Sequence, residues 1–394
     1  MFKQTNWWLA AAVAAGLLGC RNSRPLGAAR IPVSVRVVDP KANYATKAVF
    51  YNLRQAAGKT ILFGQQDATQ YGIGWHDQTD RSDVKSVCGS HPALYGWDVA
   101  EVVNARLRGR PATDSVLRRH RQLVVDVYQR GGLNTFCWHM NNYMTGGNFY
   151  DTTATVAAIL PGGAQHAAFR RDLDVIADFF RHLRAPNGRT IPVIFRPFHE
   201  HTGSWFWWGK RHCTRAEFVH LWQFTVHYLR DEQKVRNLLF AYSPDRVPNM
   251  REYFERYPGD DFVDVLGFDD YGDFNTISAT PNRGVATLDS IVAEARQRGK
   301  IAALTEAGLE KVTAPNWFND NLLGQLKAHP QARQIAYLMV WRNARLNHFY
   351  APYPGDASVP GFLQFYADSV TTFESDHPRL YTVPRRRGHS GELN

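Results

Sequence analysis

The chain has 394 residues, of which 44% are hydrophobic and 13% aromatic, and its formal net charge at pH 7 is +10. This composition describes a well-packed globular protein. The positive charge raises the question of a nucleic-acid partner. Lys and Arg are scattered, however, apart from short clusters at residues 106–110 and 385–387, and no nucleic-acid-binding motif accompanies them. We therefore predict a solvated basic surface and exclude a nucleic-acid partner.

The first 20 residues predict an export signal. Lys3 precedes an apolar stretch that is too short for a stable membrane helix, and Leu17-Leu18-Gly19-Cys20 resembles a bacterial lipobox. We expect cleavage before Cys20 and a lipid on its thiol, which would be the only contact with a membrane. The alternative is an ordinary signal peptide cut a few residues later. Both place the protein outside the cytoplasm, in the periplasm, at the cell surface or secreted.

Residues 21–43 contain Arg, Pro, Gly and Ser without periodicity, so we predict a tether between the lipid and the fold. The other three cysteines, Cys88, Cys137 and Cys213, fit neither a disulfide framework nor a CxxC metal site. Cys137 lies in an apolar run and is expected to be buried and reduced. Cys88 and Cys213 are then the only pair that could form a disulfide.

From residue 44 to about 380, short apolar runs alternate with amphipathic segments, which is typical of parallel strands joined by helices. The candidate strands span residues 60–63, 93–97, 133–138, 191–196, 237–241, 263–268, 301–305 and 335–340. The candidate helices span residues 46–57, 114–129, 165–183, 215–229, 249–257, 288–298, 317–328 and 361–372. This order predicts an α/β fold with one domain, a (β/α)₈ TIM barrel, followed by a basic tail at 381–394.

A doubly wound open sheet is the alternative, and the polar residues decide against it. In a barrel the functional groups follow the C-terminal ends of several strands. The eight predicted strands are each followed by polar or aromatic residues: Gln65-Gln66-Asp67, Asp98, His139-Met140-Asn141-Asn142, His199-Glu200, Asp245, Asp269-Asp270-Tyr271, Glu306 and Trp341-Arg342-Asn343.

Glu200 and Glu306 carry the predicted chemistry. Glu200 lies within Arg196–Gly209, beside a histidine and shortly before four aromatic rings, and Glu306 ends a second apolar run. A proton donor with flat apolar surfaces nearby suits glycoside cleavage, for which a pair of carboxylates is required. His199-Glu200-His201 does not have the four-residue spacing of an HExxH zinc motif. We therefore expect no metal and no cofactor.

The chain resembles glycoside hydrolase family 26, which is best known for endo-β-1,4-mannanases. The resemblance covers most of the chain after residue 45 and is carried by residues 63–72, 196–209, 263–271 and 305–308. It implies a barrel whose acid/base, Glu200, follows the fourth strand and whose nucleophile, Glu306, follows the seventh.

The resemblance also implies roles for other residues. Tyr271 would hydrogen-bond the nucleophile, and Arg196 either supplies positive charge nearby or serves a structural ion pair. His199 would contact the sugar 2-hydroxyl. The further expected sugar contacts are Trp205 beside the acid, Trp341 under the sugar at the cleavage point, and Arg342 and His139 on the non-reducing side. Core packing is the alternative for Trp341, Trp207, Trp208 and His139.

The resemblance implies a retaining hydrolase that cleaves β-1,4-mannosidic linkages in mannan, galactomannan or glucomannan by double displacement. The nearest alternative is a related hydrolase of another β-glycan, either mixed-linkage glucan or β-1,3-xylan. The alternative from a different class is a glycan-binding lipoprotein without activity. Retention of both Glu200 and Glu306 argues against it, since a binding protein has no need of the pair.

Overall fold

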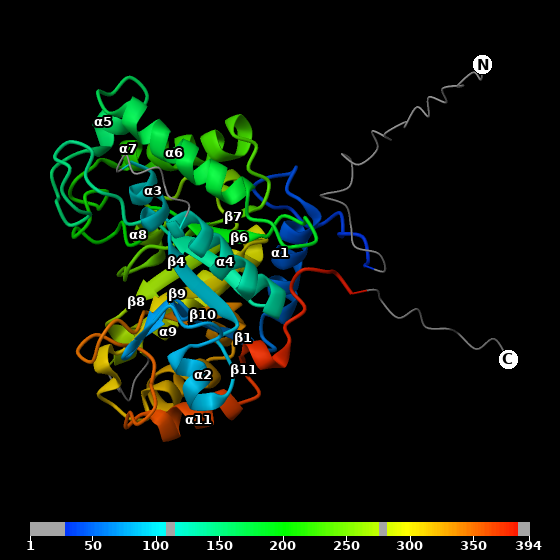
Figure 1. Cartoon of the computed structure of the whole chain (residues 1–394). Helices are drawn as coiled ribbons and strands as arrows, with labels where there is room; N and C mark the ends of the chain where they lie inside the picture. Colours follow the sequence, from blue (N-terminus) through cyan, green and yellow to red (C-terminus); the bar gives the residue numbers. More distant parts are fainter. Residues whose placement is uncertain (1–27, 108–114, 276–281, 385–394) are drawn as a thin grey trace, which may run out of the picture.

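The computed structural model describes residues 28–107, 115–275 and 282–384 and shows a closed parallel barrel surrounded by helices (Figure 1). Eight strands form the barrel, and the first pairs with the last in register from Leu62 with Tyr337 to Gln65 with Val340. These strands are β1 (Ile61–Gln66), β4 (Leu94–Asp98), β5 (Leu133–Cys137), β6 (Val193–Arg196), β7 (Leu238–Tyr242), β8 (Val265–Asp270), β9 (Ile301–Ala307) and β10 (Tyr337–Val340). The predicted (β/α)₈ fold is confirmed, and the doubly wound alternative is excluded.

Helices cover the outside of the barrel because each faces it with an apolar stripe. The longer ones are α4 (Ser115–Arg130), α6 (His166–Arg181), α7 (Arg215–His227), α9 (Arg283–Arg298) and α11 (Val359–Ala367). Shorter ones are α2 (Asp83–Cys88), α3 (Ala100–Leu107), α5 (Val156–Ile159), α8 (Met250–Tyr253) and α10 (Gly324–Ala328). Two short strands, β2 (Tyr71–Gly72) and β3 (Trp75–His76), form a hairpin after β1, and β11 (Thr371–Thr372) pairs with β1. No helix in the described ranges is long and apolar enough to cross a bilayer.

Helix α1 (Tyr44–Ala56) closes the N-terminal end of the barrel. Asn43 caps the helix by accepting a hydrogen bond from the Thr46 amide. Its buried face, Val49, Phe50 and Leu53, joins the apolar cluster formed by barrel residues such as Leu62 and Ile194. The C-terminal end of the barrel, where the strands point, is therefore the end left for a site.

The predicted tether is wrong for its described part. Residues 28–43 pack against the barrel: the Val38 amide donates to Asp264 Oδ1 at 2.7 Å, and Asp39 forms a salt bridge with Arg236 at 3.0 Å. The composition of the segment concealed this, because individual backbone hydrogen bonds and an ion pair hold it without a helix or strand. The predicted signal, Cys20, and residues 21–27 lie outside the described residues, as do 385–394 and 108–110 of the basic clusters.

Cys88 and Cys213, the one pair that the sequence left open, form no disulfide, since both thiols are free. Each is engaged locally: the Cys88 thiol donates to the Ser90 carbonyl at 3.4 Å, and that of Cys213 to the Trp208 carbonyl at 3.5 Å. Cys88 ends α2 after the first strand, whereas Cys213 lies between β6 and α7. Cys137 is free and only 2% exposed, as predicted.

Candidate active site

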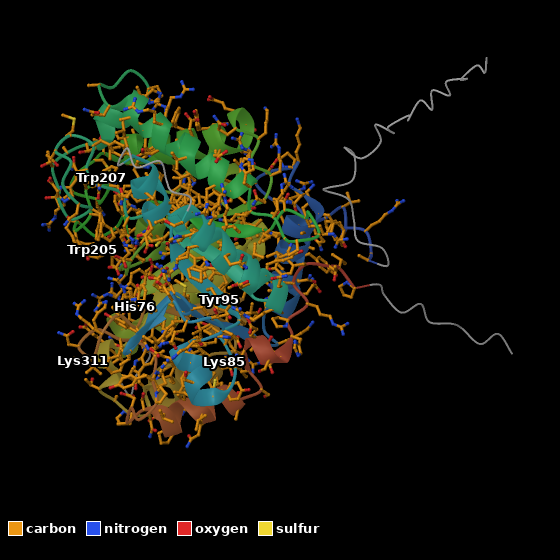
Figure 2. All side chains as sticks on the ribbon, viewed as in Figure 1. His76, Lys85, Tyr95, Trp205, Trp207 and Lys311 are labelled. Atoms are coloured by element: carbon orange, nitrogen blue, oxygen red, sulfur yellow. The ribbon has the colours of Figure 1, made fainter. Side chains whose placement is uncertain are left out.

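Three carboxylates converge at the C-terminal end of the barrel. One oxygen each from Glu200, Asp269 and Glu306 lie within 4.8 Å of one another. Glu200 follows β6, whereas Asp269 and Glu306 lie at the C-terminal ends of β8 and β9, so barrel closure brings together residues separated by up to 106 positions. Figure 2 shows Trp205, which contacts Glu200, on the side of the molecule away from α1.

The backbone after β6 is held in a rare conformation that sets the direction of Glu200. Phe198 and Glu200 both have positive φ angles, 52° and 53°. Non-glycine residues adopt this region only where the surroundings enforce it, often at functional sites. Phe198 is fully buried against Trp138, Phe218 and Trp222. The Glu200 amide donates to the Ser243 carbonyl at 2.8 Å, which fixes the turn.

Glu200 is held as an acid. It is 9% exposed, and Trp205 Nε1 donates to its Oε2 at 2.6 Å. Burial raises the pKa of the Glu200 carboxyl well above its usual value, and the negative charges of Glu306 and Asp269 act in the same direction. The Trp205 hydrogen bond opposes them weakly. Since Trp205 engages one oxygen, the other is left to hold the proton.

Glu306 is held by hydrogen-bond donors on both of its carboxyl oxygens. Arg196 Nη2 donates to Oε1, and the Tyr271 hydroxyl donates to Oε2 at 2.8 Å. Burial and the Glu306 charge raise the pKa of Tyr271 well above its usual value, so the phenol keeps its proton. Arg196 is 1% exposed and also donates to Asp269 Oδ2 at 2.7 Å. Burial raises the pKa of Asp269 well above its usual value, and the charge of Arg196 acts in the opposite direction.

A bulge in β9 turns Glu306 into the barrel. Ile301 and Ala303 face the interior cluster, and Ala302 and Leu304 face the helices, so strict alternation would direct residue 306 outward. The register with β8 shifts between Phe268–Leu304 and Asp269–Glu306, which inserts Thr305 as an extra residue. The Thr305 hydroxyl donates to Asp269 Oδ1 at 2.5 Å.

His199 and His201 are both buried and contact different neighbours. His199 lies against His139, with 4.7 Å between ring centroids, and against Phe206 at 5.2 Å. His201 lies against Phe218, and its Nε2 is 3.0 Å from the Tyr242 hydroxyl. Burial lowers the pKa of His199 well below its usual value and that of His201 to about 3, so both rings are neutral. Nδ1 of His199 is buried and has no hydrogen-bond partner among the described residues.

His139 is oriented by Asp98 at the end of the preceding barrel strand. Its Nδ1 lies 2.9 Å from Asp98 Oδ2, and its amide donates to Asp98 Oδ1 at 3.2 Å. Although burial acts in the opposite direction, the charge and hydrogen bond of His139 lower the pKa of Asp98. The ring reaches Trp341, with 5.9 Å between centroids. His139 is therefore more than a core histidine, because it faces the residues after β10.

Trp341 and Arg342 form one wall of the site with the hairpin after β1. Both are half-buried, and the Arg342 guanidinium lies 6.0 Å from the Trp341 ring centroid. Arg342 Nη1 donates to the Tyr71 hydroxyl at 3.1 Å, which in turn donates to Asp67 Oδ2 at 2.6 Å. Burial raises the pKa of Asp67 to about 7. This chain of bonds fixes Arg342 at the rim.

Trp207 and Trp208 take the core-packing alternative. Both are fully buried, and their indole N–H groups donate to the carbonyls of Met140 at 2.9 Å and His199 at 2.8 Å. Trp205, by contrast, is 39% exposed. Its ring lies over Gly203, where a Cβ would come within 2.3 Å of the indole, so the close approach requires glycine.

Two groups of charged or sulfur-bearing side chains have the spacing of metal ligands. In the first, Glu200, Asp269 and Glu306, the Arg196 guanidinium bridges two of the carboxylates and supplies the positive charge that a cation would bring. In the second, Asp98, Cys137 and His139, burial raises the pKa of the thiol well above its usual value. A protonated thiol is a poor metal ligand.

Sequence reasoning located all eight predicted site residues at this end of the barrel but missed several of their partners. Asp269 and Asp98 were visible as polar residues at strand ends, although nothing in the sequence linked them to Arg196 and His139. Tyr150, which stacks on Phe206, and Tyr350, which packs against Tyr271, lie in long loops without periodicity. No sequence signal pointed to them.

The sequence profile of glycosyl hydrolase family 26 matches residues 38–344. A mannan endo-1,4-β-mannosidase of Bifidobacterium adolescentis is 38% identical over 325 residues, which are 79% of this chain and 32% of that protein. The chain thus spans about a third of the length of this curated relative. It spans 46% of another mannan endo-1,4-β-mannosidase, from Thermothelomyces thermophilus, at 29% identity over 60% of this chain.

Solved structures of family 26 enzymes are also similar to this chain. A family 26 β-mannanase from Bacteroides ovatus is 39% identical, with a TM-score of 0.78 over 88% of this chain and 100% of that chain. A modular endo-β-1,4-mannanase from Cellulomonas fimi is 37% identical, with a TM-score of 0.82 over 90% of this chain and 81% of that chain. The chain belongs to glycosyl hydrolase family 26.

Proposed function

We propose that this protein is a retaining mannan endo-1,4-β-mannosidase. The observation that carries the proposal is the pairing of two carboxyl groups with different partners: Glu200, held by Trp205, and Glu306, held by Arg196 and Tyr271, have oxygens within 4.8 Å of each other. Retaining glycosidases hold their two carboxyl groups about 5–5.5 Å apart, whereas inverting enzymes need room for a water between them. The substrate class is supported by the relatives, which are named as mannanases.

In the first step the Glu306 carboxylate attacks the anomeric carbon while Glu200 gives its proton to the departing glycosidic oxygen. The bond to the leaving sugar breaks as a covalent glycosyl ester forms on Glu306. In the second step the Glu200 carboxylate takes a proton from water, whose oxygen attacks the same carbon and releases Glu306. Two inversions give net retention, and Glu200 ends the cycle protonated.

Some of the surrounding residues position Glu200 and Glu306, and others would contact the sugar. Tyr271 and Arg196 hold Glu306 through hydrogen bonds, and Trp205 holds Glu200 and offers its exposed face to the leaving-group side. His199 would contact the 2-hydroxyl. The remaining sugar contacts, on the non-reducing side, would be Trp341, Arg342 and His139.

The test is product release from linear β-1,4-mannan, galactomannan, lichenan and β-1,3-xylan by protein lacking residues 1–20. Glu306→Ala is assayed alongside, with Glu232→Ala, an exposed glutamate at the opposite end of the barrel, as the control. We expect mannan cleavage that Glu306→Ala loses and Glu232→Ala keeps. Cleavage of only another glycan would overturn the assignment of mannan as the substrate, and no cleavage at all would favour a glycan-binding protein.

We further propose that the protein is exported and anchored through a lipid on Cys20. The support is the sequence of residues 1–20. When the full chain is expressed in a bacterial host, Cys20→Ser should move the protein from the membrane fraction to the soluble fraction. An unchanged distribution would contradict the anchor.

A further inference from the structure

The base of the barrel is the end away from the candidate active site, and the N-terminal segment leads to it. Figure 1 shows the first described residues, in dark blue, and the last, in red, on the side of α1, whereas Figure 2 shows Trp205, His76 and Lys311 on the other side. Residues 34–40 run past α1, and the C-terminal segment returns beside them, with the Ala29 amide donating to the Val383 carbonyl at 3.0 Å. Chain preceding residue 28 therefore joins the molecule at the base.

A group of cations, which we call the basal patch, lies on this end. It consists of Arg36, Lys47, Arg54, Lys59, Arg296 and Lys300. The last turns of α1 and α9 supply Arg54 and Arg296, and Lys59 and Lys300 precede β1 and β9. Basic residues suit these positions because helix C-termini carry partial negative charge.

The basal patch is continuous and largely open to solvent. Arg36, Lys47, Arg54 and Lys300 line one groove, and Arg54, Arg296 and Lys300 line the adjoining one. Arg36, Arg54, Lys59 and Arg296 are exposed, and Lys47 and Lys300 are half-buried. Within the described ranges, none of the six forms a salt bridge with a carboxylate.

Acidic residues near the patch are largely committed to other cations. Asp260 forms a salt bridge with Arg298 at 3.3 Å, and Asp231 forms one with Arg230 at 2.7 Å. Asp261 is the remaining carboxylate in the groove and is exposed. The groove thus retains an excess of positive charge after these pairs are set aside.

The opposite end of the barrel carries the carboxyl groups of the site, which are buried: Asp67, Asp98, Glu200, Asp269 and Glu306. The cations of the basal patch, by contrast, are largely exposed. An anionic surface would attract them and turn the base toward it.

We propose that the basal patch docks the protein on an anionic lipid surface and turns the candidate active site away from it. The positive charge of the basal patch complements an anionic lipid surface. The chain before residue 28 joins the fold at this same end of the barrel, which would bring the basal patch, and not the site end, to the membrane. Val33, which is fully exposed next to Arg36 on this segment, offers an apolar side chain at the same surface. The proposal holds whether or not Cys20 carries a lipid, and it does not depend on the sugar that is cleaved.

The energetic reason for such a patch is that one lipid chain alone gives reversible membrane binding, and a polybasic surface supplies a second signal. Lys and Arg close to an anionic leaflet each contribute about a fivefold gain in affinity. The effect falls within a Debye length, about 10 Å at 0.1 M salt. Docking should therefore be sensitive to both lipid charge and ionic strength.

The test is co-sedimentation of protein lacking residues 1–20 with lipid vesicles. The described contacts of the fold begin at Ala28, so this truncation removes none of them. Vesicles of phosphatidylcholine alone are compared with vesicles that also contain phosphatidylglycerol, at low and high salt. The basal variant combines Arg54→Glu, Lys59→Glu and Arg296→Glu. The control variant combines Arg211→Glu, Arg251→Glu and Lys311→Glu, which are exposed cations at the site end.

We expect binding to phosphatidylglycerol vesicles that high salt removes, a loss of about a hundredfold in the basal variant, and near-normal binding in the control variant. Glycan hydrolysis by the basal variant should equal that of the unaltered protein, which shows that it is folded. Equal binding to neutral vesicles, equal loss in both variants, or no binding to anionic vesicles would overturn the proposal. Preference for a soluble polyanion, dextran sulfate, over vesicles of equal charge would also overturn it.

Discussion

Trp205 donates its indole N–H to Glu200 Oε2 at 2.6 Å while its ring remains 39% exposed. One side chain therefore does two things: it positions the carboxyl group and presents an aromatic face to solvent beside it. The bond favours the ionised form of Glu200, whereas burial and the charge of Glu306 favour the protonated form more strongly. The protonation state of Glu200 therefore depends on the balance between this hydrogen bond and the combined effect of burial and the Glu306 charge.

Replacing Trp205 with Phe should shift this balance toward the acid. The substitution removes the N–H donor and keeps an aromatic ring, so the pKa of Glu200 rises further. A general acid fails when it ionises, and the alkaline limb of the pH profile of kcat/KM should therefore move to higher pH. Trp341→Phe is the matched control, since it should change affinity without moving the limb. An unmoved limb in Trp205→Phe would contradict the role of the bond.

Glu200→Ala should separate substrates by their leaving group. Loss of a general acid costs roughly 10²–10⁴-fold on natural mannan. An aryl β-mannoside with a very good leaving group needs little protonation, so its first step should be much less affected. The alkaline limb should also disappear on this substrate, since the ionising group has been removed. Equal losses on both substrates would remove Glu200 from the role of acid.

Tyr271→Phe should weaken the reaction without abolishing it. The phenol donates to Glu306 Oε2 at 2.8 Å, and a hydrogen bond to a charged group contributes about 1.5–3 kcal/mol. We expect kcat/KM to fall by about 10–100-fold, because the bond from Arg196 to the other oxygen remains. Tyr257→Phe, whose hydroxyl bonds an exposed carboxylate, is the control. A loss as large as that of Glu306→Ala would show that Tyr271 does more than hold the carboxylate.

The positions of Glu200 and Glu306 could be predicted because each follows an apolar run that ends at a barrel strand. All eight strands begin within two residues of the predicted start, since buried parallel strands are short, apolar and bounded by polar residues. Their partners could not be predicted. Arg196 meets Asp269 and Glu306 only because the barrel closes with a given register, and the bulge at Thr305 that turns Glu306 inward has no sequence signal.

The N-terminal segment shows a second limit. Residues 21–43 were expected to be a tether because they lack periodicity, yet a few specific contacts are enough to hold residues 28–43 on the barrel. Those contacts depend on Asp264, which lies more than two hundred residues away and is 1% exposed. The hydrophobic periodicity of a short segment contains no information about a hydrogen-bond partner so distant in the chain.

Asp264→Ala should therefore destabilise the whole domain. Asp264 accepts hydrogen bonds from the buried amides of Val38 at 2.7 Å and Phe240 at 2.9 Å, so truncation leaves two donors without partners. Each unsatisfied donor costs about 1–3 kcal/mol, so the two together predict a loss of about 2–6 kcal/mol in the free energy of unfolding by urea. Asp261→Ala, three residues earlier and exposed, should change it by less than about 0.5 kcal/mol. If both variants unfold at the same urea concentration, the carboxylate does not hold the N-terminal segment to the barrel.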